Sequence, residues 1–308
     1  MHVLVTGGLG FLGHALTLNL LSAGHRVTVM SRGRADAKPV PGADLVIGDV
    51  RDRSRLGEVV RTGEFEGVCH LAAVTSGRDS LADPLTYFDV NAGGTLNLLA
   101  ALDKGRKPVA VVLASTNIVY GSAQVGALSE SLGVHPESPY AASKVAAEHM
   151  VTAYAATGAI GASVLRCFNI AGAVDGVGDT DNARIIPNVF RAMTGQLPHV
   201  TLNGDGSAVR DFVHVADVAD AFRLALTRAK PGENQLYNVG SGVGVSMAEV
   251  VATAERVTGN RVAVKRMPPK PEPQSLTADV GRAADGLGWR PKQSGLGRII
   301  ADAWDAWH

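Results

Sequence analysis

The 308-residue chain has little cysteine, few aromatic residues and no net charge. Its two cysteines, Cys69 and Cys167, lie in apolar runs, which predicts buried thiols and does not indicate an oxidising compartment. Lys plus Arg and Asp plus Glu number 29 each, so no overall field attracts nucleic acid or an anionic membrane. No run is long and apolar enough to span a bilayer, and the N-terminus lacks the basic region of a signal peptide. These absences predict a cytoplasmic protein that binds neither nucleic acid nor membrane.

A glycine-rich segment lies at the start of the chain, where Thr6-Gly7-Gly8-Leu9-Gly10-Phe11-Leu12-Gly13 follows the apolar run Val3-Leu4-Val5. The residues before it read as a strand, and Phe11–Ala23 reads as a helix that ends at Gly24. The backbone N–H groups of such a loop, together with a helix N-terminus, can bind a pyrophosphate. A tight turn without a ligand is the alternative. In this strand–loop–helix context the segment predicts a dinucleotide site.

A tyrosine and a lysine four residues apart, Tyr140 and Lys144, follow the helix-opening pair Ser138-Pro139. Residues at this spacing share one face of a helix. A lysine ammonium in that position favours the phenolate of Tyr140, whose ordinary pKa of about 10 is too high for a base at neutral pH. The alternative is a chance pair on a solvated helix. Beside a dinucleotide site, the pair predicts hydride chemistry with Tyr140 as the proton carrier.

Strand-like and helix-like runs alternate through the first part of the chain. The predicted strands are His2–Thr6, Arg26–Met30, Asp44–Ile47, Gly67–Leu71, Val109–Ala114 and Gly161–Arg166, and the predicted helices are Phe11–Ala23, about Asp52–Thr62, Pro84–Lys104 and Pro139–Thr157. This alternation predicts an α/β protein with a Rossmann-type, doubly wound parallel sheet covered by helices on both faces.

Beyond Phe168 the pattern changes to shorter elements separated by loops rich in glycine, Asp and Asn. Val213–Arg228 and Gln235–Gly240 read as one more helix and strand of the first sheet, and Pro268–Pro273 reads as a stiff, exposed turn. We therefore expect a dinucleotide-binding domain from residues 1–168 plus about 212–240. A smaller, interleaved C-terminal substrate lobe is expected from residues 169–211 plus about 241–308.

Further sequence blocks complete a pattern that covers nearly the whole chain. They are Gly48-Asp49-Val50, His70-Leu71-Ala72-Ala73, Asn91-Ala92-Gly93-Gly94-Thr95, Ser115-Thr116-Asn117-Ile118-Val119-Tyr120-Gly121, Arg166-Cys167-Phe168-Asn169-Ile170-Ala171-Gly172-Ala173, Val209-Arg210-Asp211-Phe212-Val213-His214-Val215 and Tyr237-Asn238-Val239-Gly240-Ser241-Gly242. With the glycine loop and the Tyr140/Lys144 pair, the chain resembles the extended short-chain dehydrogenase/reductase family, in its NAD-dependent epimerase/dehydratase branch. The last three blocks are typical of members that act on nucleotide sugars.

The resemblance implies roles for individual residues. Tyr140 is implied as the acid/base, Lys144 as a ligand of the nicotinamide ribose, and Thr116 as a proton relay; a hydroxyl that caps a loop is the alternative for Thr116. The implied cofactor contacts are Gly7, Gly10, Phe11, Leu12, Gly13, Ser31, Arg32, Asp49, Val50, Leu71, Ala72, Ala73, Asn91, Ser115, Tyr140 and Lys144, and the implied substrate contacts are Thr75, Thr116, Tyr140, Asn169 and Arg210. Asn169 and Arg210 are implied for the diphosphate, where a guanidinium suits the phosphate oxygens. No metal site is predicted.

Three positions depart from the family pattern. The acidic residue that normally ends the second strand is Ser31, followed by Arg32, which favours NADP because a carboxylate no longer repels the 2′-phosphate. A solvated basic turn is the alternative reading, and NAD the alternative cofactor. Asn203 replaces the residue that packs on the nucleotide base, and Lys270-Pro271-Glu272-Pro273 replaces a segment that supplies a second arginine.

The predicted function is a nucleotide-sugar epimerase that acts at C4 through a transient keto-sugar with a bound nicotinamide cofactor. An NADP-dependent nucleotide-sugar ketoreductase is the alternative, and a non-catalytic dinucleotide-sensing protein is a remote one. A dehydratase is disfavoured because Asn117-Ile118 stands where related dehydratases have an Asp-Glu pair. The expected partners are a sugar-nucleotide substrate and a second copy of the chain in a homodimer.

Overall fold

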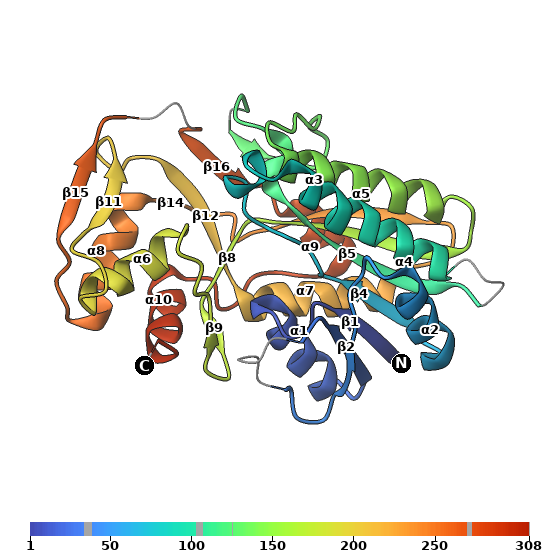
Figure 1. Ribbon diagram of the computed structural model, residues 1–308. Coiled ribbons are helices and arrows are strands. Elements are labelled where there is room, and N and C mark those ends of the chain that lie inside the picture. Colours follow the sequence, from blue (N-terminus) through green and yellow to red (C-terminus); the bar gives the residue numbers. More distant parts are fainter. Residues whose placement is uncertain (34–38, 103–106, 125, 270–272, 308) are drawn as a thin grey trace. The chain divides into compact units, whose positions relative to one another are not determined.

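The computed structural model describes residues 1–33, 39–102, 107–124, 126–269 and 273–307 (Figure 1). By its internal contacts the chain forms two compact units. The first unit comprises residues 1–121, 133–167 and 219–237, and the second comprises 122–132, 168–218 and 238–308. The division into a dinucleotide-binding domain and a substrate lobe, with the boundaries expected from the sequence, stays a proposal about the function of these units.

The first unit is built on a sheet of seven strands in the order β13-β7-β5-β4-β1-β2-β3. The strands are β1 (His2–Thr6), β2 (Arg26–Ser31), β3 (Asp44–Ile47), β4 (Gly67–His70), β5 (Val109–Thr116), β7 (Ile160–Cys167) and β13 (Asn234–Val239). From β3 to β7 every neighbouring pair is parallel. The chain starts in the middle at β1 and winds outward in both directions, which confirms the predicted Rossmann-type, doubly wound sheet.

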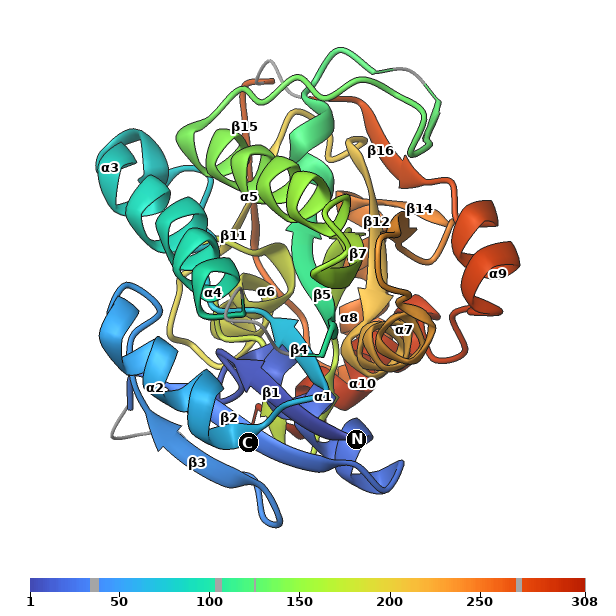
Figure 2. The same cartoon turned by 90° about the vertical axis from the view of Figure 1, so that its right-hand side faces the viewer.

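Helices cover both faces of this sheet (Figure 2). They are α1 (Phe11–Ser22), α2 (Arg53–Gly63), α4 (Gly94–Leu102), α5 (Pro139–Ala155) and α7 (Val215–Arg228). Apolar side chains of α2, α4 and α5 form one buried cluster with those of the central strands; its members include Leu56, Leu98, Ala147, Leu4 and Leu113. On the other face Leu226 of α7 lies directly over Gly67 of β4, where a side chain on the glycine would collide with it. The branched residues of the strands thus pack between two helical layers, as expected for a parallel sheet.

The predicted helix Pro84–Lys104 is helical without a break from Pro84 to Leu102, and it contains a π-helical turn that the sequence did not predict. The chain first makes a short 3-10 turn, η1 (Asp79–Leu81), then α3 (Pro84–Tyr87), a π-helical turn, η2 (Phe88–Gly93), and then α4. Residues 103 and 104 lie outside the described residues. A π turn inserts one extra residue into a helix, and periodicity alone does not reveal it because the apolar spacing on either side still looks helical.

The second unit contains small sheets and four helices in the described residues, where the sequence had indicated short elements without placing them. Its strands are β6 (Ala127–Leu128), β8 (Asn169–Ala171), β9 (Ala173–Val174), β10 (Val177–Gly178), β11 (Val200–Asn203), β12 (Val209–His214), β14 (Gly244–Ser246), β15 (Val264–Met267) and β16 (Ser275–Ala278), and its helices are α6 (Ile185–Met193), α8 (Met247–Thr258), α9 (Gly281–Leu287) and α10 (Leu296–Asp305). Strand β12 pairs with β8, β14 and β16, and α6, α8 and α10 supply a second apolar core around Phe190. Residues 270–272 of the predicted proline turn lie outside the described residues.

In the described part of the chain, none of the helices has the length and apolar character needed to cross a membrane.

Candidate active site

Most of the predicted cofactor residues of the first unit lie at or after the ends of parallel strands, whereas Asn91, Tyr140 and Lys144 lie on helical elements. Strands β1, β2, β4 and β5 end at Thr6, Ser31, His70 and Thr116, and the predicted contacts begin within one residue of these ends. Because the strands are parallel, their carboxyl ends meet at one edge of the sheet. In open α/β sheets ligands bind outside this edge, so the fold brings the predicted residues to the position where a dinucleotide would be expected.

The glycine loop passes very close to the segment that follows β4. Gly7 has a φ of +73°, and a Cβ on it would lie 2.9 Å from the backbone nitrogen of Ala72. The N–H of Gly10 donates to the carbonyl of Gly7 at 3.0 Å, and a Cβ on Gly13 would collide with the same carbonyl. Helix α1 starts directly after Gly10, which provides no side-chain cap. Uncapped N–H groups at a helix N-terminus fit a pyrophosphate.

Asn91, in the π turn η2, fixes the segment that carries Ala72, Ala73 and Thr75. Its buried side chain accepts a hydrogen bond from the N–H of Val74 at 2.9 Å and donates to the carbonyl of Val74 at 3.1 Å. It also donates to the hydroxyl of Ser143 on α5 at 2.9 Å. Asn91 therefore ties the loop after β4 to the helix of Tyr140 and Lys144. The direct cofactor contact that the resemblance implied for Asn91 stays a prediction.

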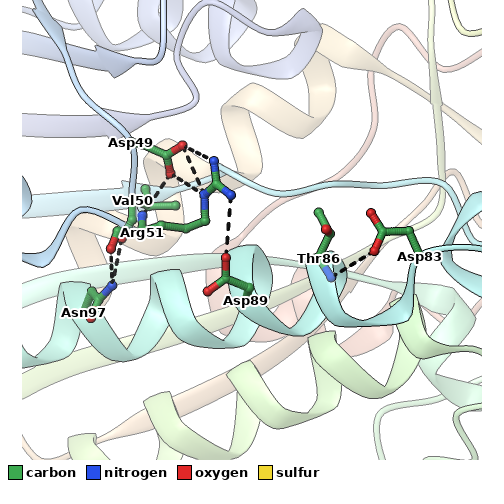
Figure 3. Close-up of polar contacts among 7 residues, drawn as sticks. All are labelled: Asp49, Val50, Arg51, Asp83, Thr86, Asp89 and Asn97. Carbon is green, nitrogen blue, oxygen red and sulfur yellow. Dashed lines mark hydrogen bonds and ion pairs between the residues drawn. The ribbon is translucent and has the colours of Figure 1, made fainter.

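Asp49 is paired with an arginine that the sequence analysis did not single out (Figure 3). Its carboxylate accepts from the backbone N–H of Arg51 at 2.9 Å and from the Arg51 guanidinium at 2.7 Å. These hydrogen bonds, with a smaller contribution from the charge of Arg32, lower the pKa of Asp49. The guanidinium of Arg51 also forms a 3.6 Å ion pair with Asp89 of η2. Asn97 of α4 donates to the carbonyl of Val50 at 3.1 Å, so the whole turn after β3 is anchored.

Ser31 ends β2, and its carbonyl accepts from the N–H of Gly48 at 2.9 Å. Arg32 is exposed, and its charge is close enough to act on Asp49. The neighbouring Arg34 lies outside the described residues.

Tyr140 and Lys144 are both buried on α5, as their spacing predicts, with only 6% and 4% of their surface exposed. The helix starts at Pro139, and Ser138 caps it by accepting from the N–H of Ala141 at 3.2 Å. The Tyr140 ring packs edge-on against Tyr87, with 6.1 Å between the ring centres. Burial lowers the pKa of Lys144 to about 8, although the charges of Glu148 and Cys167 oppose this shift. At neutral pH the lysine is therefore still largely an ammonium, the form that favours a phenolate.

The hydroxyls of Thr116 and Ser115 have different partners. Thr116 is buried at the end of β5, and its hydroxyl oxygen accepts from the N–H of Ile118 at 3.3 Å, which caps the short helix η3 (Asn117–Tyr120). The capping role considered for Thr116 is thus present. Its own O–H remains able to donate, so capping and proton relay are compatible. Ser115 donates to the carboxylate of Glu148 and is also buried.

Asn169 and Arg210 belong to the second unit and lie on the paired strands β8 and β12. Asn169 donates from its amide to the backbone carbonyl of Asp211 at 2.9 Å. Arg210 donates to the carbonyls of Val209 and Pro273, each at 2.8 Å. Asn203 ends β11 in the same unit.

The sequence analysis missed two charged residues close to the Tyr140/Lys144 pair, Glu148 and Arg166. They form a buried ion pair in which the nearest atoms are 2.7 Å apart. Glu148 follows Lys144 at the same four-residue spacing that links Lys144 to Tyr140. That repeat was the available signal. Among the described residues, no group of three or more His, Cys, Asp or Glu side chains is placed to hold a metal ion.

Comparison with known proteins identifies the family and the fold. The protein-family model for the NAD dependent epimerase/dehydratase family matches residues 3–240. A UDP-glucose 4-epimerase of Streptomyces lividans is 37% identical over 99% of this chain and 95% of its own length. The crystal structure of UDP-glucose 4-epimerase from Brucella ovis with NAD aligns with a TM-score of 0.93 and 33% identity, covering 99% of this chain and 97% of that one. A UDP-glucose 4-epimerase from Stenotrophomonas maltophila with bound NAD and formylated UDP-arabinopyranose gives 0.92 and 30%, with coverage of 99% and 97%.

The fold and the glycine loop thus define a Rossmann-type dinucleotide-binding enzyme. The chain belongs to the NAD dependent epimerase/dehydratase family, within the extended short-chain dehydrogenases/reductases, and the predicted family and fold class are confirmed.

Proposed function

We propose that this protein interconverts UDP-sugars that differ in configuration at C4, with a nicotinamide dinucleotide as its resident cofactor. The observation that carries the proposal is the buried pair of Tyr140 and Lys144 on one face of α5, in the same unit as a glycine loop that has no room for side chains. The predicted class, a nucleotide-sugar epimerase, is supported by UDP-glucose 4-epimerases that align with this chain over 95% and 97% of their own length. The ketoreductase and the dinucleotide sensor are not favoured.

The residues present fit a dinucleotide. Gly7, Gly10 and Gly13 keep the loop free of side chains next to the uncapped start of α1, where a pyrophosphate would bind. Asp49 and Val50 form the anchored turn proposed for the adenine, and Lys144 is proposed for the nicotinamide ribose. When bound, the nicotinamide supplies a reversible hydride acceptor.

The contribution of the chain itself is proton transfer and orientation. The Tyr140 phenolate accepts the proton of the C4 hydroxyl, directly or through Thr116, as the C4 carbon is oxidised to a ketone. After the sugar has rotated, the same Tyr140 O–H returns the proton to the C4 oxygen as hydride is added to the opposite face. The proton and the hydride are both restored, so the reaction needs no external oxidant or reductant. Lys144 favours the phenolate in the first step.

The direct test incubates the purified protein with UDP-galactose and follows UDP-glucose formation without added dinucleotide. Denaturing the same sample and identifying the released dinucleotide by mass shows whether the cofactor is resident. Epimerisation with about one dinucleotide per chain is expected. Turnover that requires added NADPH and yields a reduced sugar would instead establish the ketoreductase.

Tyr140→Phe should abolish epimerisation and keep the fold and the bound cofactor, because it removes one hydroxyl and retains the ring. Loss of an acid/base group typically costs about 10²–10⁴-fold in rate. Tyr154→Phe, on the same helix, is the matched control and should stay fully active. A Tyr140→Phe enzyme with more than about a tenth of the wild-type rate would exclude the assigned role.

The preference between NAD and NADP stays a prediction, because one observation favours NAD and another favours NADP. Two solved relatives contain NAD, whereas β2 of this chain ends in Ser31, not in an acidic residue, and exposed Arg32 follows it. We expect the wild type to bind NADP at least as well as NAD, and Ser31→Asp to shift the ratio of the two affinities toward NAD by restoring a carboxylate. Ser54→Asp, exposed on α2, controls for added charge. An unchanged affinity ratio in Ser31→Asp would show that residue 31 does not face the ribose.

Arg210→Ala should weaken UDP binding by at least about tenfold, because each hydrogen bond to a charged group contributes roughly 1.5–3 kcal/mol. The dinucleotide content should be unchanged. Arg210→Lys keeps the charge without the two-pronged geometry and should lose less affinity. Titration calorimetry with UDP measures the affinity of both variants for UDP. Equal UDP affinity in wild type and Arg210→Ala would exclude Arg210 from the diphosphate site. Its hydrogen bonds to the carbonyls of Val209 and Pro273 would then be structural.

We propose a homodimer formed through the helical stretch η1–α4. Four large apolar side chains on it are exposed: Leu81, Leu85, Phe88 and Leu96, with 67%, 78%, 39% and 55% of their surface accessible. Such a row on a monomer marks an interaction site, and a second copy of the chain would cover it with the same row.

Leu85→Glu combined with Leu96→Glu should convert the dimer to a monomer in sedimentation or light scattering. Val243→Glu, an equally exposed apolar position in the second unit, should leave the oligomeric state unchanged. A dimer that survives the double substitution would place its interface elsewhere.

A further inference from the structure

Helix α5 carries three ionisable residues along its buried face. Tyr140, Lys144 and Glu148 are spaced by four residues, and 6%, 4% and 5% of their surfaces are exposed. At this spacing, side chains of neighbouring helical turns meet. The first two are the proposed proton-transfer pair, and the third has no part in that chemistry.

Glu148 connects α5 to the two strands beneath it. One carboxylate oxygen accepts from the hydroxyl of Ser115 and, at 3.1 Å, from Nε of Arg166. The other accepts from Nη2 of Arg166 at 2.7 Å. Ser115 on β5 and Arg166 on β7 are direct neighbours in the parallel sheet. The guanidinium carbon of Arg166 also lies 4.7 Å from the centre of the Tyr120 ring, which limits its movement.

A buried ion pair of this kind contributes little to the stability of a folded protein. Removing two charges from water costs several kcal/mol per ion, and apolar residues of similar volume often stabilise a protein equally well. The Glu148–Arg166 pair is nevertheless placed one helical turn from the only lysine that the proposed mechanism uses. Its position therefore suggests a role in that mechanism.

Besides Glu148, two titratable groups interact electrostatically with Lys144, and both are neutral near pH 7. Burial lowers the pKa of His70, at the end of β4, to about 3, and burial raises the pKa of Cys167, at the end of β7, to about 12. Burial itself lowers the pKa of Lys144, and Glu148 is the first of the groups that oppose it. Among these groups Glu148 is thus the anion that can offset the cost of a buried ammonium.

We propose that Glu148, oriented by Arg166, is a positioning residue that keeps the buried Lys144 side chain in its ammonium form and fixes Ser115, the neighbour of Thr116. The inference deepens the proposed function, since it concerns the lysine assigned to favour the Tyr140 phenolate. Glu148 acts through Lys144 and Ser115, and touches neither substrate nor cofactor in this assignment.

Two substitutions separate charge from packing. Glu148→Gln keeps the shape of the side chain and removes the charge, whereas Glu148→Asp keeps the charge and shortens the reach. The protonation of Lys144 is followed by NMR titration of labelled lysine side chains, with the signal assigned from a Lys144→Met sample. This readout needs no substrate, so it is independent of the proposed reaction.

Glu148→Gln should lower the midpoint of the Lys144 titration by about one pH unit, the lower end of the effect of a neighbouring opposite charge. The sign follows from the loss of an anion that favours the charged form. A one-unit drop from about 8 reduces the ammonium fraction at pH 8 from about a half to about a tenth. Turnover at pH 8 should then fall about fivefold with little change in KM, and recover below pH 7.

Glu148→Asp should keep the Lys144 midpoint close to that of wild type, although both variants lose stability because contacts with Ser115 or Arg166 weaken. An unchanged Lys144 midpoint in Glu148→Gln, or equal shifts in the two variants, would overturn the inference and leave a structural ion pair.

If Glu148→Gln does not fold, the double variant Glu148→Gln/Arg166→Gln removes both charges together and leaves no unpaired ion. A downward shift of the Lys144 midpoint is expected there too, smaller than in Glu148→Gln because the cation Arg166 is also removed, and the absence of any downward shift counts against the proposal. A wild-type protein without epimerase activity whose Lys144 midpoint still depends on Glu148 would refute the proposed function and retain this inference.

Discussion

The parallel pairing of β2, β1, β4 and β5 is the constraint on which the candidate site of the first unit depends. Parallel strands all end at the same edge, so four loops that are distant in the sequence begin beside one another. The contact between Gly7 and Ala72 shows how close these loops come, since even a methyl group on Gly7 would collide with the neighbouring backbone. Position 7 therefore requires glycine, and the lack of side chains in this loop leaves the N-terminus of α1 accessible to a ligand.

Burial has opposite consequences at the two ends of the site. In the turn proposed for the adenine, the charges of Asp49, Arg51 and Asp89 are partly exposed, and their mutual attraction contributes little beyond fixing the turn. On the inner face of α5 the same kinds of group are almost fully buried, where each charge needs a partner. The pKa of Lys144 near 8 reflects this balance between desolvation and Glu148. A buried lysine without an anion beside it would lose its proton more readily and favour the phenolate less.

The sequence predicted the first unit well because its features are local. A strand, a glycine loop and a helix follow one another within 25 residues, and Tyr140 and Lys144 are one turn apart. Arg166 could not be assigned in this way, since its partner Glu148 lies on another element and only the fold brings them together. Arg51 was missed because it follows the recognised Gly48-Asp49-Val50 block and its pairing with Asp89 is likewise non-local. In the second unit the strands are only two to six residues long, too short for periodicity to show.

The π turn η2 explains why one sequence stretch serves both the interior and the surface. Each residue of an α-helix rotates the side-chain direction by about 100°, so one inserted residue turns everything after it by that amount. Within η2, Asn91 faces inward and bonds to Val74 and Ser143, while Phe88 stays exposed. Ser143 in turn donates to the carbonyl of Tyr140 at 2.7 Å, so the inserted turn is connected to the proposed acid/base by two hydrogen bonds. In a regular helix that keeps the residues before the turn in place, Asn91 would point away from Val74 and Ser143. The loop after β4 would then lose its link to α5.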